Sequence, residues 1–136
     1  MYEKAFFLDV IAPDRSIYRD EATSLSAPGT NGGFQILYNH APFLSTLEVG
    51  RMTIKRKDGS DIVIATSGGF VEVRRNRVVV LVEAAERVDE IDVERARAAR
   101  ERAEKRLHTR GPQIDNARAQ LALLRALNRL RIAGKA

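Results

Sequence analysis

The stretch VVVLVEAAERVDEIDVERARAARERAEKRL, residues 78–107, decides the fold, because the side-chain pattern changes within it. It begins with Val78–Val82, an apolar and largely β-branched run typical of a strand. Its second half consists mainly of alanine, arginine, glutamate and lysine, which are strong helix formers. Asp92 stands where the N-cap of a helix is expected. We therefore predict a β domain, residues 1–88, followed by a helical segment, residues 89–136.

The first 88 residues follow a period of two, as strands do. Residues 5–11 carry apolar side chains on both sides, which indicates a strand inside a sandwich. Other strands are expected to be half-buried. Met52 and Ile54, for example, alternate with polar neighbours. Glycine, proline, aspartate and asparagine separate the runs and predict turns. These patterns indicate a β-sandwich or flattened barrel of about 85 residues. The expected strands include residues 5–11, 51–55, 62–65, 70–73 and 78–82.

The helical segment is predicted to be a two-helix hairpin. Gly111-Pro112 ends a first helix over residues 92–107, and a second helix is expected over residues 114–132. The first helix carries a narrow apolar stripe of Ala96, Ala99, Ala103 and Leu107. The second carries a wider one of Ala117, Leu121, Leu123, Leu124, Leu127 and Leu130. Because alanine buries little area, we expect a weak seam that allows the hairpin to open.

Charge divides the chain at the same place as the side-chain pattern. Residues 1–91 carry 11 Lys+Arg and 13 Asp+Glu, whereas residues 92–136 carry 12 and 5. Such a basic tail is suited to an acidic partner, a phosphate ligand or a nucleic acid. The chain has no cysteine, no apolar run near the roughly 20 residues of a membrane-spanning helix, and no pattern of a secretory signal. If the protein works at a membrane, we expect a partner to hold it there.

The arginines of both predicted helices repeat with the spacing of one helix face, within about 40° of rotation. The repeat comprises Arg118, Arg125 and Arg129 on the second helix and Arg95, Arg102 and Arg106 on the first. One interpretation is a solvated charged face. The other is an anion site, because the second helix has Asp115 as its only acid. Closing the hairpin would then bring like charges together unless a ligand such as a triphosphate neutralised them.

Three other motifs have ordinary structural explanations. Asp92 needs no ligand if it caps a helix, and the acidic residues around it favour the helix dipole. Ser67-Gly68-Gly69-Phe70 lacks the Lys-Ser/Thr of a P-loop, so its glycines are expected in a turn or bulge. His40 has no recognisable catalytic partner and is expected to hydrogen-bond a turn or to contact a partner protein. Nothing in the sequence resembles an enzyme site.

Several motifs together resemble the epsilon subunits of F-type ATP synthases, in the family's order and over nearly the whole chain. They are SGGFVEV at Ser67–Val73, AAER at Ala84–Arg87, Ile91-Asp92-x-x-Arg95-Ala96, GFQILYNHAP at Gly33–Pro42 and RALNRL at Arg125–Leu130. The resemblance implies an α+β fold, in which an antiparallel β-sandwich of about ten strands precedes a two-helix hairpin. It assigns residues 1–88 to binding of the gamma subunit and the c-ring, and residues 89–136 to regulation.

By this resemblance the chain is a non-catalytic rotor subunit that requires no cofactor and holds no metal. It is expected to be a peripheral protein on the cytoplasmic face of the bacterial inner membrane, without inserting into the membrane. The expected c-ring contact includes Asn31, Gly32, Gly33, Phe34 and His40. The extended hairpin is expected to run along gamma, to face an acidic loop of the beta subunit and to inhibit ATP hydrolysis.

Family members from thermophilic bacilli bind ATP in the folded hairpin, which implies ATP as a regulatory ligand here. The matching residues are Glu86, Ile91, Asp92, Arg95, Ala96, Arg102, Arg118, Arg125 and Arg129. Bound ATP favours the folded hairpin only if it binds that state more tightly. The chain departs from the bacillar pattern at Leu124, where that pattern has a lysine, and Gly111-Pro112 gives a stiffer turn. Both departures bear on the balance between the two states.

Two functions of other classes are alternatives to this interpretation. A nucleic-acid-binding module would explain the basic tail, but residues 92–136 contain no aromatic side chain that could stack on a base. We therefore expect no nucleic acid among the partners. An enzyme that uses Glu86 or His40 predicts turnover by the isolated chain, which we do not expect.

Overall fold

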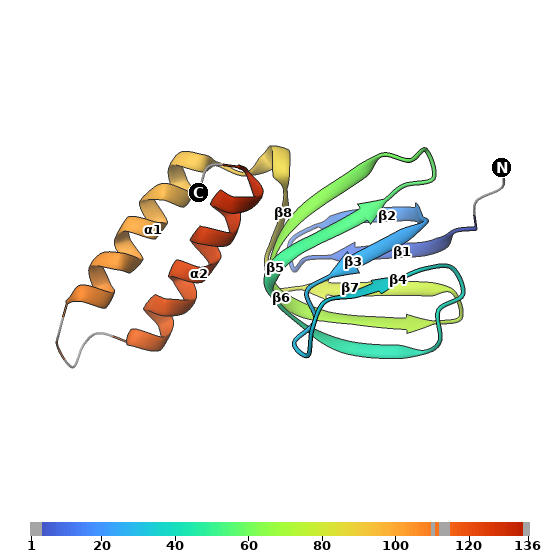
Figure 1. Cartoon of the computed structure of the whole chain (residues 1–136), viewed down its shortest axis with the longest axis horizontal. Helices are drawn as coiled ribbons and strands as arrows, with labels where there is room; N and C mark the ends of the chain where they lie inside the picture. The colour runs from blue at the N-terminus through green and yellow to red at the C-terminus, as the bar shows by residue number, and fades with distance from the viewer. Residues whose placement is uncertain (1–3, 110, 112–114, 135–136) are drawn as a thin grey trace. The chain divides into compact units, whose positions relative to one another are not determined.

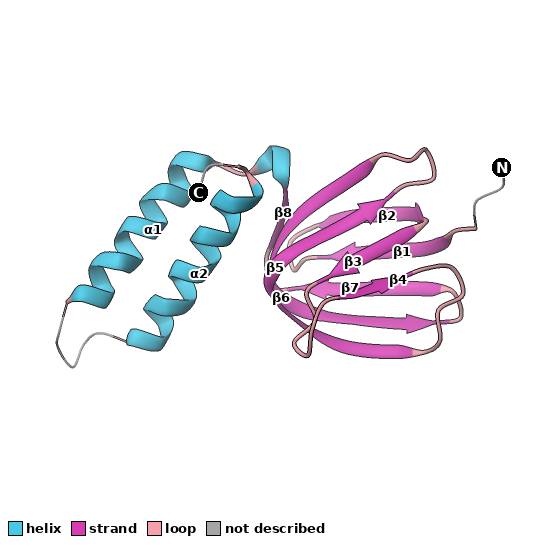
Figure 2. Ribbon diagram, in the orientation of Figure 1, coloured by secondary structure: helices cyan, strands magenta, loops and turns pink. Residues whose placement is uncertain are grey.

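The structure, a computed structural model, describes residues 4–109, 111 and 115–134 of the 136-residue chain. The chain divides into two compact units, Met1–Arg87 and Val88–Ala136. In the described residues, eight strands form the first unit and two α-helices the second (Figures 1 and 2). This is the α+β fold that the sequence predicts, with a strand count close to the expected ten or so.

The strands form a sheet that folds over on itself, as Figure 2 shows. They are β1 Phe6–Ile11, β2 Ser16–Ala22, β3 Ser24–Ala27, β4 Phe34–Ile36, β5 Phe43–Lys55, β6 Asp61–Arg74, β7 Arg77–Val82 and β8 Ala85–Arg87. Their order is β2-β1-β7-β6-β5-β3-β4, and β8 pairs with β6. The described pairs are antiparallel as predicted, except that β1 and β7 run parallel.

β6 is one long strand where the sequence suggested two. Gly68 and Gly69 lie in its middle with φ of +120° and +141°, which glycine adopts at little cost. At this point β6 changes partner, because Thr66 pairs with β8 whereas Gly69 pairs with β7. The register with β5 is unbroken across the two glycines. They therefore form a bend within a continuous strand, and the predicted turn or bulge at this motif was wrong.

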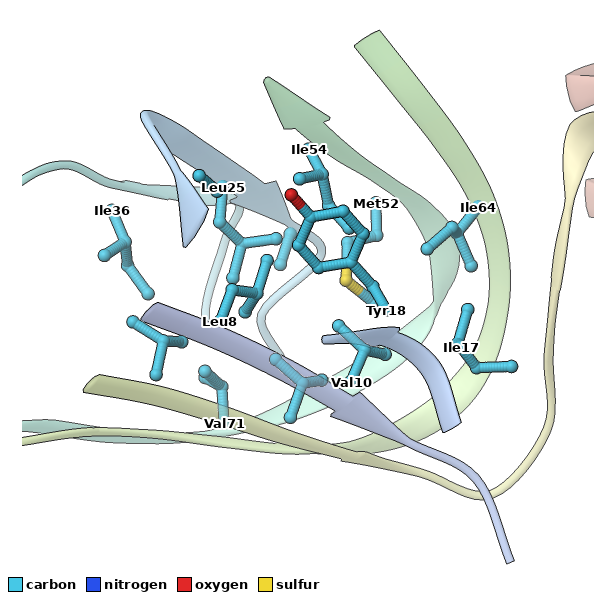
Figure 3. Close-up of a cluster of buried hydrophobic side chains, with 14 of the residues drawn as sticks. Leu8, Val10, Ile17, Tyr18, Leu25, Ile36, Met52, Ile54, Ile64 and Val71 are labelled. Atoms are coloured by element: carbon cyan, nitrogen blue, oxygen red, sulfur yellow. The ribbon is translucent and has the colours of Figure 1, made fainter. Parts of the chain in front are cut away.

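The period-two alternation fills one hydrophobic core. β1 buries Phe6, Leu8 and Val10 and leaves its other side chains half-buried. On β5, Met52 and Ile54 are fully buried. Figure 3 shows how such side chains from different strands meet inside the folded sheet. Since each buried CH₂ is worth about 0.8 kcal/mol, this core is what holds the sandwich together.

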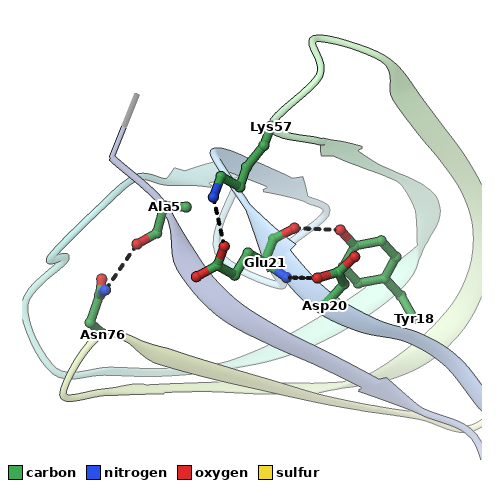
Figure 4. A network of polar contacts seen from close by, with 6 residues as sticks. All are labelled: Ala5, Tyr18, Asp20, Glu21, Lys57 and Asn76. Atoms are coloured by element: carbon green, nitrogen blue, oxygen red, sulfur yellow. Dashed lines mark hydrogen bonds and ion pairs between the residues drawn. The ribbon is translucent and has the colours of Figure 1, made fainter. Parts of the chain in front are cut away.

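Tyr18 brings the one large polar group into the drawn part of this core (Figure 3). Its hydroxyl donates a hydrogen bond of 2.5 Å to the carbonyl oxygen of Glu21, which satisfies the buried group (Figure 4). Burial raises the pKa of the Tyr18 hydroxyl, and the charge of Asp20 acts in the same direction. On the surface nearby, Lys57 forms an ion pair of 2.9 Å with Glu21.

The second unit contains α1, Val93–His108, and α2, Asn116–Ile132, and a short 3₁₀ turn, Val88–Glu90, precedes α1. Both helices begin at an aspartate N-cap. The Asp92 carboxylate accepts from the Arg95 backbone N–H at 3.0 Å, which confirms the predicted cap. Asp115 does the same for Arg118 at 3.0 Å. Pro112 and Ile114, at the predicted start of the second helix, lie outside the described residues. No helix among the described residues is long and apolar enough to cross a membrane.

The seam between the helices is lined mainly by alanine on both sides. The buried residues are Ala96 and Ala103 of α1 and Ala119, Ala126 and Leu130 of α2. The predicted stripe on α2 was partly wrong, because Leu121 and Leu124 are 41% and 47% exposed. Small side chains let the two backbones approach closely, whereas leucines at these positions would hold them apart. The seam therefore buries even less apolar area than the sequence suggested.

Candidate functional site

Six arginines of the hairpin share one structural position: each directly precedes a predicted or observed seam residue. They are Arg95, Arg102 and Arg106 on α1 and Arg118, Arg125 and Arg129 on α2. One residue corresponds to about 100° of helical rotation. The residue before a seam residue is therefore turned by about 100° away from the seam. Because the two helices run antiparallel, this turn points to the same side of the hairpin on both helices (Figure 1). The two arginine rows therefore lie side by side.

The antiparallel arrangement also sets the level of each arginine along the hairpin. The start of α1 lies beside the end of α2, so Arg95 is roughly level with Arg129, and Arg106 with Arg118. Arg125 and Arg129 are half-buried, and the Arg125 Nε atom is buried. The other four arginines are exposed. We call this set of six the arginine side.

The carboxylates within the two helices are positioned away from the arginine side, whereas the N-cap residues Asp92 and Asp115 lie next to Arg95 and Arg118 at its two ends. Glu94 and Glu101 precede the seam alanines by two residues, which turns them roughly opposite the seam, and Glu104 follows a seam residue. α2 has no acid within its helical residues. Like charges on neighbouring rows repel, and a polyphosphate is the kind of ligand that neutralises them through charge-assisted hydrogen bonds.

The Ile91-Asp92-x-x-Arg95-Ala96 motif has structural roles in the hairpin. Asp92 is the N-cap, Ile91 occupies the preceding position, where an apolar residue often packs against the first turn, and Ala96 is fully buried in the seam. The Ala96 methyl is thus occupied by helix packing. Glu86, the remaining residue of the predicted nucleotide site outside the hairpin, lies in β8 of the other compact unit.

A hollow of about 510 Å³ on the hairpin is formed by α1 alone. It is lined by Ala98, Glu101, Arg102, Glu104, Lys105 and His108. Arg102 is the one residue of the predicted nucleotide site that it includes, so the hollow does not by itself describe that site. Within the described residues, no three His, Asp or Glu side chains gather closely enough to hold a metal ion.

The predicted c-ring residues lie on both sides of β4: Asn31, Gly32 and Gly33 are in the loop before it, Phe34 is its first residue, and His40 is in the loop after it. The first of these loops is fastened to β5. Thr30 bonds to Thr46 through backbone and side chain, and Gly29 bridges to Leu47. Asn31, Gly32 and Gly33 are exposed beyond these anchors. The loop is thus held at its base and presents its tip to solvent.

Phe34 and His40 are brought together by a residue that sequence reasoning missed. The Phe43 ring lies edge-on to Phe34, with centroids 5.0 Å apart, and to His40, at 5.6 Å. His40 also places its Nδ1 at 2.7 Å from the Ala41 carbonyl oxygen, which agrees with the predicted hydrogen bond to a turn. Phe43 could have been found from the sequence, because it directly follows the His40-Ala41-Pro42 end of a recognised motif.

A second exposed surface lies on the outer face of β5, β6 and β7. Phe70 and Leu81 are direct cross-strand neighbours, and Leu44 is diagonal to Phe70. The three side chains are 38%, 42% and 65% exposed in that order. Apolar residues at outward positions of neighbouring strands are typical of a docking surface. The sequence did not identify this face, because it gives no strand order.

Comparison with known proteins agrees with both units. Residues 5–88 match the family model of the ATP synthase delta/epsilon chain beta-sandwich domain, and residues 89–134 match that of its long alpha-helix domain. The chain is 47% identical over 135 residues to the ATP synthase epsilon chain of Syntrophomonas wolfei, spanning 99% of this chain and 98% of that one. It is 46% identical over 127 residues to that of Moorella thermoacetica, spanning 93% and 95%.

Solved structures share the fold at low sequence identity. A chain of the mitochondrial ATP synthase OSCP/F1/c-ring structure from Euglena gracilis has a TM-score of 0.78 and 20% identity, over 88% of this chain and 76% of that chain. One from the central stalk and c-ring of the Tetrahymena thermophila enzyme has a TM-score of 0.59 and 14% identity, over 97% of each chain. The relatives at 44–47% identity are ATP synthase epsilon chains along nearly their whole length. The chain therefore belongs to the ATP synthase delta/epsilon chain family.

Proposed function

We propose that this protein is a non-catalytic rotor subunit of ATP synthase that couples the catalytic head to the membrane ring. The observation that carries the proposal is the match of both units, in order, to the two domains of this family. The solved relatives with this fold are found in ATP synthase structures that contain a c-ring. The protein acts at the cytoplasmic face of the bacterial inner membrane, held there by its partners.

Two surfaces of the sandwich suit two partners. The loop with Asn31, Gly32 and Gly33 is anchored at its base and exposed at its tip, and Phe34 and His40 flank it around the Phe43 ring, an arrangement that suits the polar loops of the c-ring. The apolar outer face around Phe70 and Leu81 suits a tighter contact with gamma, because burying exposed apolar side chains stabilises a permanent interface.

The hairpin is the regulatory part of the proposed subunit. Its alanine seam makes opening inexpensive, and its basic arginine side favours the acidic loop of the beta subunit once the hairpin is extended. In that state it inhibits ATP hydrolysis. In the folded state the same arginines lie together, and ATP bound to them stabilises the hairpin by mass action.

A hydrolysis assay on reconstituted ATP synthase tests the regulatory role. The complex is assembled with the whole chain or with a chain truncated after Val88, and co-purification verifies that each is incorporated. We expect the truncated form to raise ATP hydrolysis several-fold while both complexes retain ring-coupled rotation. Equal hydrolysis by the two complexes would contradict inhibition by the hairpin and leave the rotor role in place.

A further inference from the structure

The turn between β6 and β7 carries an unusual density of positive charge. Arg74, Arg75 and Arg77 fall within four residues, and Arg75 and Asn76 have φ of +51° and +60°, so the chain reverses tightly between them. The turn borders a hollow of about 280 Å³ that is lined by Glu72, Arg74, Arg75, Arg77 and Val79. We call this the basic tip of the sandwich.

The charges of the basic tip are not neutralised within the protein. In the part of the chain that the structure describes, none of its three arginines lies within ion-pair distance of a carboxylate. The Arg77 guanidinium lies over the Phe7 ring, 4.7 Å from its centroid, and Lys4 lies over Tyr38 at 5.2 Å. Among the residues lining the hollow, Glu72 is the one acid. The described residues that line the hollow thus carry three cations and one carboxylate.

Asn76 fixes the basic tip to the loop that contains Asn39. Its side-chain oxygen accepts from the Asn39 backbone N–H at 2.8 Å. Its side-chain N–H₂ donates to the Ala5 carbonyl at 3.0 Å, as Figure 4 shows. Its own carbonyl accepts from the Phe7 backbone N–H at 3.3 Å. The turn, the first strand and the loop are therefore one rigid surface.

We propose that the basic tip binds the headgroup phosphates of acidic phospholipids in the membrane beside the c-ring. The inference rests on the proposed function for one step, that the loop ending at His40 meets the ring. If it does, the rigid connection through Asn76 brings the arginines to the same membrane surface. Arginine suits phosphate because its planar guanidinium offers two parallel donors. Phe7 and Val79 add apolar surface beside the charges, as an interface between headgroups and protein requires.

Binding of the full-length protein to vesicles tests the proposal. The variant Arg74→Gln/Arg75→Gln/Arg77→Gln is compared with Arg19→Gln/Arg51→Gln/Lys55→Gln, which removes the same charge from exposed positions of β2 and β5. Each cation near an anionic membrane strengthens binding roughly fivefold. We expect the tip variant to bind phosphatidylglycerol vesicles at least roughly tenfold more weakly than the wild type, and the control variant to lose much less. Arg→Lys at the three tip positions keeps the charge but loses the paired donors, so its binding should lie between that of the wild type and that of the Gln variant.

Four results would overturn the proposal. If the tip and control variants lose vesicle binding equally, the binding depends on net charge and not on the position of the arginines. If the wild type binds phosphatidylcholine vesicles as tightly as phosphatidylglycerol vesicles, the tip does not recognise acidic lipid. If soluble glycerol phosphate saturates the tip, as followed at the Arg75 amide, with the affinity measured for vesicles, the ligand is a free phosphate and not a lipid surface. If the tip variant binds vesicles normally but no longer binds a lipid-free c-ring, the tip contacts the c-ring protein and not lipid. Failure of ring binding in His40→Ala with normal vesicle binding separates the ring contact from the tip. Thermal unfolding verifies that every variant is folded.

Discussion

Gly69 is the residue at which the sandwich depends most directly on the absence of a side chain. A Cβ there would lie 2.0 Å from the Leu81 carbonyl oxygen and 2.8 Å from the Val82 Cα, both backbone atoms that cannot move aside. We predict that Gly69→Ala destabilises the sandwich by about 3 kcal/mol or more, through strain at positive φ and displacement of β7. Urea unfolding followed by circular dichroism measures the change.

Gly59→Ala is the matched control, because Gly59 also has positive φ but a Cβ added there would meet no atom within 4 Å. It should cost only backbone strain, about 1 kcal/mol. Similar losses in the two variants would show that the contact with β7 is unimportant.

Ionisation of Tyr18 makes the stability of the sandwich depend on pH. Its pKa is raised above 10.0 in the folded protein, so the folded state keeps the hydroxyl protonated where the unfolded chain ionises. Its contribution is therefore complete below about pH 10 and is lost as pH rises toward the folded pKa. We predict that Tyr18→Phe costs about 1 kcal/mol near neutral pH, through the lost bond to Glu21, and that this difference shrinks above about pH 10. Tyr38→Phe, at an exposed position, is the control for removal of a tyrosine hydroxyl outside the core. A constant difference between wild type and Tyr18→Phe across this range would contradict the assignment.

Single residues were predictable where the cause is local. The alternation of Met52 and Ile54 with polar neighbours predicted a half-buried strand, and both side chains are buried. Asp92 was recognised as an N-cap from its neighbours alone. Gly68 and Gly69 were misread, because a glycine pair has the same sequence signature in a turn and in a bend of a long strand. Which of these occurs depends on the partner strands β7 and β8, which the sequence does not specify.

At the scale of the elements, substitutions of Asp92 distinguish its role as the N-cap of α1 from a role in ligand binding. Removing the cap in Asp92→Ala should destabilise the hairpin by about 1 kcal/mol, seen as reduced helical circular dichroism on heating. Asp92→Ser keeps a capping oxygen and should restore most of that stability. If Asp92→Ser is as unstable as Asp92→Ala, the carboxylate does more than cap the helix.

The pairing of elements shows where sequence patterns stop. Helix bounds were predicted to within about two residues from composition and caps. The side of α2 that faces α1 was not predicted, because α2 has both an alanine stripe and a leucine stripe. Which stripe faces α1 depends on how the two helices pack together. The same holds for the parallel pairing of β1 with β7, which joins segments about 70 residues apart.

At the scale of the whole molecule, the two partner surfaces of the sandwich should be separable by mutation. Leu81→Glu puts a charge into the apolar outer face and should weaken co-purification with gamma at least roughly tenfold. Leu37→Glu, at a similarly exposed leucine beside the predicted ring residues, should instead weaken binding to the c-ring. If each variant affects both partners equally, the assignment of one surface to each partner is wrong.

The central claim is that the arginine side of the hairpin is a nucleotide site. Calorimetric titration of the isolated protein with magnesium-free ATP tests it, beside Arg118→Gln and Arg125→Gln. Arg131→Gln is the matched control, because Arg131 follows Leu130 and so points to the other side of the hairpin. We predict saturable one-to-one binding that either arginine-side variant weakens by about 10- to 100-fold, and that the control leaves nearly unchanged. Absence of binding at millimolar ATP, or equal losses in all three variants, would contradict the claim and leave a rotor subunit whose hairpin responds to its protein partners alone.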